Sequence, residues 1–67
     1  MKDNNLQFLI LGRIASVKCA KGNPYVQNGL YREAYGFILG VHAAGAITDE
    51  EWKIYDKALE NAYTGHN

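Results

Sequence analysis

Cys19 and His42 are the side chains whose types most readily suggest nucleophilic chemistry in this chain. A catalytic cysteine reacts as a thiolate that a nearby base activates, in a setting that also stabilises the oxyanion. No oxyanion-type glycine motif surrounds Cys19, and its spacing from His42 matches no pattern of nucleophile and base. We therefore predict a structural cysteine, no catalytic residues and a protein that is not an enzyme.

Metal binding needs more ligands than the sequence offers. Structural zinc usually takes four cysteine or histidine ligands at close paired spacings, whereas the only such residues here are Cys19, His42 and His66. The acidic run over residues 49–51 could hold a cation, but negative side chains are also what the first turn of a helix favours. We predict no metal site and no cofactor.

Protein contact is the chemistry that the residue types favour. The chain contains five tyrosines and one tryptophan, and tyrosine gives a large contact area at low entropic cost. The candidate partner-binding residues lie in one segment, and they are Tyr31, Tyr35, Gly36, Leu39, Gly40 and His42. The alternative, left open here, is that the tyrosines complete a small core.

Small residues recur every four positions in the same segment, at Gly36, Gly40 and Ala44. Each glycine inside a helix costs about 0.5–1 kcal/mol relative to alanine. A smooth groove that another helix approaches closely would offset this cost, whether that helix belongs to this chain or to a partner.

Apolar residues at spacings of three and four predict three helices that position these side chains, over about residues 5–21, 29–44 and 49–63. In the first, one face is formed by Leu6, Ile10, Ile14 (or Arg13) and Val17. Phe8 and Leu11 lie off it, as expected where a second subunit or partner also covers the helix. A strand over residues 6–11 remains an alternative.

Two turns divide these helices. Gly22 follows Lys18 and Lys21 and is expected to end the first helix in the left-handed conformation. Residues 22–29 are expected to form a loop, because Pro24 keeps the preceding residue out of helical geometry and an Asn-Gly pair closes the segment.

The last helix has the clearest start signal. Thr48 is the expected N-cap, Glu51 can return its hydrogen bond, and Ile47 and Trp52 occupy the hydrophobic staple positions. Gly45 is expected to end the preceding helix, so the last two helices form a hairpin. The predicted fold class is all-α, one three-helix domain over residues 1–67.

Length, charge and composition limit the possible sources of stability and the possible location of the protein. The chain has 67 residues and a net charge of zero, with +3 over residues 1–45 and −3 over residues 46–67. A domain of this size has a small core and no possible internal disulfide, so we expect association with itself or with a partner to contribute stability. No stretch approaches a membrane span, and the apolar start lacks the features of a secretion signal. We expect a cytoplasmic protein.

Nucleic-acid binding is the second hypothesis. Its candidate residues form a basic set, Arg13, Lys18, Lys21 and Arg32. The neutral net charge and the acidic start of the last helix argue against it, because phosphate would repel that helix. A purely structural oligomerisation module is the third hypothesis.

Two resemblances can be given. Residues 45–52, Gly-Ala-Ile-Thr-Asp-Glu-Glu-Trp, resemble the C-terminal helical hairpins of many bacterial proteins. The whole chain is similar in size and style to the small orphan proteins encoded by phages and prophages of enteric bacteria. This resemblance implies an accessory protein that binds and modulates or inhibits a host or phage protein in the bacterial cell.

Overall fold

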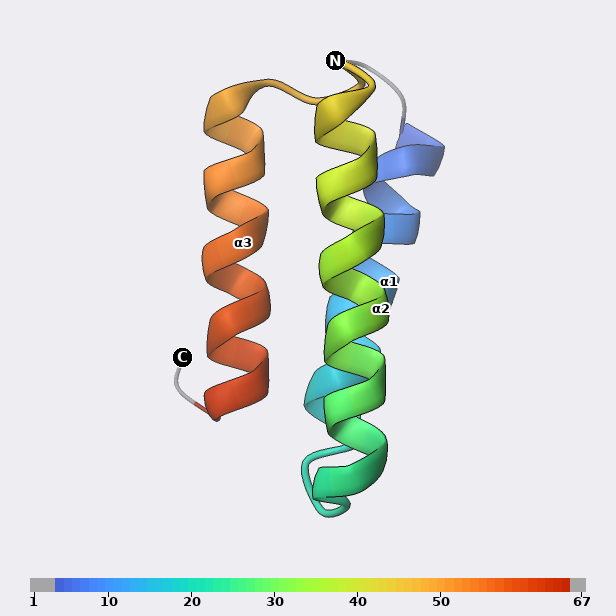
Figure 1. Ribbon diagram of the computed structural model, residues 1–67, viewed down its shortest axis with the longest axis vertical. Helices are drawn as coiled ribbons and strands as arrows, with labels where there is room; N and C mark the ends of the chain where they lie inside the picture. Colours follow the sequence, from blue (N-terminus) through green and yellow to red (C-terminus); the bar gives the residue numbers. More distant parts are fainter. Residues whose placement is uncertain (1–3, 66–67) are drawn as a thin grey trace.

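The computed structural model describes residues 4–65, and it is an all-α bundle of three helices (Figure 1). They are α1 (Asn4–Cys19), α2 (Pro24–Ala43) and α3 (Asp49–Thr64). The described residues contain no strand. The predicted fold class is therefore confirmed, and the strand alternative over residues 6–11 is wrong.

Each helix packs against both of the others, with α3 beside α2 and α1 behind it in Figure 1. The buried apolar side chains form one core that all three helices share, made of Ile10, Ile14, Val17, Ala34, Ile38, Ile47, Leu59 and Ala62. The predicted inner face of the first helix supplies three of these residues. The three helix axes run side by side, so the outer face of each helix extends along the length of the molecule.

The start of α2 corrects the predicted loop over residues 22–29, which is wrong for most of its length. Asn23 is an N-cap with φ −134° and ψ 89°, and its side chain accepts a hydrogen bond from the Val26 N–H at 3.3 Å. Pro24 is the first helical residue, where its missing N–H has no intrahelical partner to lose and its fixed φ suits the helix. The same proline that excludes helical geometry at Asn23 thus begins a helix.

The end of α1 also differs from expectation. The helix ends at Cys19, and Gly22 is not left-handed. A turn carries the chain onward instead, with the Asn23 N–H donating to the Ala20 carbonyl at 2.9 Å. The sequence offers three good N-cap residues for this helix, Asp3, Asn4 and Asn5. Asn4 and Asn5 lie inside α1, and Asp3 lies outside the described residues.

Gln27 ties the two helices together at this end. It is the one buried polar residue of the described chain, and its Nε2 donates to the Val17 carbonyl in the last turn of α1 at 3.0 Å. A buried amide without a partner would cost about 1–3 kcal/mol. This hydrogen bond therefore holds the first turn of α2 against α1.

The connection from α2 to α3 follows the predicted hairpin. Gly45 is left-handed with φ 79°, its N–H donates to the His42 carbonyl, and the Ala46 N–H donates to the Val41 carbonyl. This is the Schellman arrangement that ends a helix at glycine. At residue 45 a side chain would be strained, so the corner depends on this glycine.

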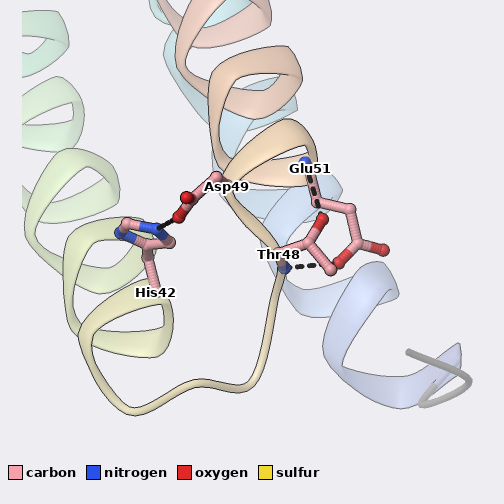
Figure 2. A network of polar contacts seen from close by, with 4 residues as sticks. All are labelled: His42, Thr48, Asp49 and Glu51. Atoms are coloured by element: carbon pink, nitrogen blue, oxygen red, sulfur yellow. Dashed lines mark hydrogen bonds and ion pairs between the residues drawn. The ribbon is translucent and has the colours of Figure 1, made fainter.

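The start of α3 has the predicted capping box (Figure 2). Thr48 Oγ1 accepts from the Glu51 N–H at 3.0 Å, and Glu51 Oε1 accepts from the Thr48 N–H at 2.8 Å. Ile47 before the cap is buried, and Trp52 after it packs against the core. The N-cap, the staple residues and the hairpin are all as predicted.

Candidate functional site

Cys19 and His42 do not meet in the fold. Cys19 ends α1 and His42 lies in the last turn of α2, so nearly the whole length of α2 separates them. A helix of 20 residues is about 30 Å long. His66, the third candidate ligand, lies outside the described residues. Within residues 4–65, no three metal-ligating side chains gather.

The acidic first turn of α3 is engaged in local contacts. Glu51 belongs to the capping box, and Asp49 Oδ1 lies 2.7 Å from His42 Nε2 (Figure 2). The hydrogen bond from His42, together with the charge of that ring, lowers the pKa of Asp49 below its usual value of 3.8. These contacts explain both carboxylates without a ligand.

His42 is fixed from a second side by Trp52. Their rings stack with centroids 4.9 Å apart and planes 14° apart. The imidazole thus contacts two side chains of α3, the Trp52 ring and the Asp49 carboxylate. His42 is part of the contact between α2 and α3, and only about a quarter of its side chain is exposed.

Tyr31 is engaged in the same way at the other end of the hairpin. Its ring stacks on Tyr63 at 4.4 Å, and its hydroxyl donates to Glu60 Oε2 at 2.6 Å. The hydrogen bond to Glu60, then burial and nearby negative charge, raise the pKa of Tyr31 to about 12. The Asn28 amide donates to the Tyr63 hydroxyl at 2.9 Å, which adds a second link between α2 and α3.

Four predicted partner-binding residues remain on the surface: Tyr35, Gly36, Leu39 and Gly40. We call these the outer face of α2. Tyr35 and Leu39 are 41% and 43% exposed. A Cβ added at Gly36 or Gly40 would meet nothing within 4 Å. The predicted six-residue surface is therefore split, because Tyr31 and His42 pack on α3 and the other four do not.

The surroundings of Gly36 and Gly40 show whether another helix of the described chain packs against them. Both are exposed, and neither α1 nor α3 comes near the space that a Cβ would fill. Within residues 4–65, the predicted groove is therefore not used by another helix. The cost of two helical glycines is not offset by packing among the described residues.

The other exposed apolar surface lies on α1. Phe8, Leu9 and Leu11 are 81%, 53% and 46% exposed, although the opposite side of the same helix is buried in the core. The sequence feature that indicated this exposed surface was the position of Phe8 and Leu11 off the predicted inner face of the helix. Leu9 was not singled out, because its exposure depends on where α2 lies.

A groove of about 310 Å³ runs beside this surface, between α1 and α2. It is lined by Phe8, Leu9, Gly12, Arg13, Ser16, Leu30 and Glu33. The Arg13 guanidinium lies over the Phe37 ring at 4.4 Å and pairs with Glu33 at 3.5 Å. Its Nε has no hydrogen-bond partner within the described residues. The groove is mainly apolar, with one neutral ion pair in it.

The predicted basic set does not form one face. Arg13 is held by Phe37 and Glu33 on α2. Lys18 follows it by five residues, which places the two side chains about 140° apart around α1. The end of the Lys21 side chain lies beside Gly65 at the end of α3. The structure therefore does not bring these cations together as a phosphate-binding surface would require.

Comparison with known proteins identifies no relative: the chain matches no protein-family model, no curated protein and no solved structure. Among the described residues, no helix is long and apolar enough to cross a membrane.

Proposed function

We propose that this chain is a small non-enzymatic module for protein–protein interaction that uses the outer face of α2. On the resemblance to phage-encoded orphan proteins, it acts in the bacterial cytoplasm as an accessory protein that binds and modulates or inhibits a host protein. The observation that carries the proposal is the pair of exposed side chains, Tyr35 and Leu39, beside two open glycines.

Three physical features support this use of the face. Tyrosine and leucine supply contact area, and Tyr35 is braced by Tyr31, whose ring lies 6.3 Å away. A braced aromatic loses less conformational entropy on binding. Gly36 and Gly40 let a partner approach the backbone of α2 closely, which is a reason to keep glycine despite its cost in a helix.

A photo-crosslinking experiment tests the proposal. A photoreactive amino acid replaces Leu39 in tagged protein expressed in an enteric bacterium, and the matched control carries it at Lys57, an exposed position of α3. We expect one defined protein adduct from position 39 and none from position 57. Gly40→Leu, introduced together with the probe, should abolish the adduct because its side chain fills the space above the backbone.

Two results would overturn the proposal. One is the absence of a defined adduct at position 39. The other is the same set of adducts at positions 39 and 57. Circular dichroism of the Gly40→Leu protein should show unchanged helix content, so that loss of the adduct reports the surface and not the fold.

A further inference from the structure

The outward side of α1 carries a second pattern that the outer face of α2 does not explain. Five exposed residues follow one another at alternating spacings of three and four, and they are Asn5, Phe8, Gly12, Ala15 and Cys19. We call them the α1 seam. Alternating spacings of three and four place side chains along the line where two helices pack lengthwise. No member of the seam is charged.

The seam has one large side chain, and it lies in the N-terminal half. The large side chain, Phe8, lies near the N-terminal end, Gly12 lies at the middle, and Ala15 lies towards the C-terminal end beside Ser16. Two such helices packed in parallel would place large against large and small against small. In antiparallel packing, Phe8 of one helix meets the small residues of the other, which is how well-packed interfaces fill space.

We infer that a second copy of this chain covers the α1 seam, with the two α1 helices antiparallel across a twofold axis at Gly12. The axis makes the contact self-complementary, as in other symmetric dimers. Phe8 of each copy then lies opposite Ala15 and Ser16 of the other, at the edge of the groove between α1 and α2. A Cβ at Gly12 would meet nothing within the described chain, so the backbone is open to close approach there.

The charges of the chain suit such a dimer. Its net charge is zero, so two copies do not repel one another overall. Arg13 and Glu33, which line the groove on one side of the seam, already form an ion pair, so covering that groove covers a neutral pair and not a lone charge. Lys18, beside Cys19 on α1, is exposed. Antiparallel helices also place the positive end of each dipole beside the negative end of the other.

The size of the surface is also sufficient. A stable dimer usually buries about 800 Å² on each copy, which is about a sixth of the 4704 Å² of accessible surface. The molecule is 34 Å long and 19 Å wide, so one broad face projects about 650 Å² as a flat rectangle, and the relief of its side chains adds to that accessible area. Phe8, Leu9 and the groove beside them form the apolar centre of such a face.

Mass measurement tests the dimer directly. Light scattering coupled to size exclusion should give twice the chain mass of 7.5 kDa for the wild type. Phe8→Glu should raise the dissociation constant by about 30-fold or more, because a central aromatic anchor is lost. Ile54→Glu is the matched control, since Ile54 is an apolar residue of α3 that is 66% exposed. It should remain dimeric, and both variants should keep the helix content of the wild type.

Disulfide trapping tests the orientation. An antiparallel pair centred on Gly12 places Asn5 of one copy opposite Cys19 of the other. On one helix these positions are about 21 Å apart, too far for an internal disulfide. Mild oxidation of Asn5→Cys should therefore give a covalent dimer. The wild type, with Cys19 alone, and the double variant Asn5→Cys, Cys19→Ser should give none.

A monomeric wild type at all concentrations, an undiminished dimer for Phe8→Glu, or efficient Cys19-to-Cys19 crosslinking in the wild type would each overturn this inference. These outcomes are separate from those for the outer face of α2. A monomer that still gives a defined adduct at Leu39 overturns the dimer alone. A dimer without that adduct overturns the proposed function alone.

Discussion

The side chains of His42 and Asp49 close the hairpin between α2 and α3, with His42 Nε2 lying 2.7 Å from Asp49 Oδ1 across the turn. The contact joins the last turn of one helix to the first turn of the next. Asp49 is thereby near both a helix N-terminus and an imidazole, and both favour its ionised form.

The first prediction concerns acid stability. The pKa of Asp49 is lowered in the folded chain, so the folded state binds its proton less readily than the unfolded state. The stabilisation from this carboxylate is fully present above its usual pKa of 3.8 and is lost as the pH falls through the lowered value. Asp49→Asn should therefore be less stable than the wild type near neutral pH, with the difference vanishing in strong acid.

Urea unfolding followed by fluorescence of Trp52, the single tryptophan, measures this difference at each pH. Glu50→Gln is the matched control, because it removes a negative charge from the same helical turn. An equal loss for Asp49→Asn and Glu50→Gln would mean that the dipole of α3 matters and the bond to His42 does not.

A second prediction concerns alkaline titration. The pKa of Tyr31 is raised from 10.0 to about 12 by its hydrogen bond to Glu60, so this contact stabilises the fold below pH 10 and its contribution is lost as the pH rises towards 12. Near-ultraviolet absorbance should show one phenol that ionises near 12, and Tyr31→Phe should remove that step. Tyr25→Phe, at an exposed position, should leave it.

Glu60→Gln separates the effect of the hydrogen bond to residue 60 from the effect of its negative charge on the pKa of Tyr31. Glutamine keeps an acceptor for the Tyr31 hydroxyl and removes the negative charge, so the step should move to lower pH without disappearing. A step that does not move would contradict the assignment to Glu60.

A third prediction concerns the capping box. Thr48→Ala leaves the Glu51 N–H without its acceptor, which should cost about 1 kcal/mol. In a domain of this size that corresponds to a fall of about 4–8 °C in Tm. Thr48→Ser keeps the hydroxyl and should retain most of the stability. Scanning calorimetry or thermal circular dichroism measures all three proteins, and equal Tm values for alanine and serine would contradict the role of the hydroxyl.

The third helix and the hairpin could be predicted from the sequence because their signals are local. Gly45, Thr48 and Glu51 make their hydrogen bonds within six residues of chain, so residue type and spacing suffice to place them. The same holds for the buried face of α1, where the spacing of Ile10 and Val17 identifies the side that enters the core.

The start of α2 and the division of the tyrosine surface could not be predicted, because they depend on distant parts of the chain. Asn23 before a proline suits both a loop and a helix start, and the buried bond of Gln27 to α1 favours the helix. Tyr31 and Tyr35 are both tyrosines one helical turn apart. Only the position of Tyr63 on α3 makes the first a packing residue and leaves the second exposed.

The last prediction is that alanine in place of the glycines on the outer face of α2 increases stability and weakens binding. A Cβ at Gly36 or Gly40 would occupy open space, so Gly36→Ala and Gly40→Ala should each stabilise the isolated chain by about 0.5–1 kcal/mol. Gly29→Ala is the matched control, because Gly29 also lies inside α2 with nothing near its Cβ position.

All three alanine variants should raise Tm, but only those at residues 36 and 40 should reduce the photo-crosslinked adduct at Leu39. Each added methyl group would hold the partner away from the backbone of α2 at those two positions, while Gly29 lies nearly two helical turns before Gly36. If all three variants stabilise the chain and none weakens the adduct, the glycines are not kept for binding. The contact at Leu39 would then rest on its exposed side chains alone.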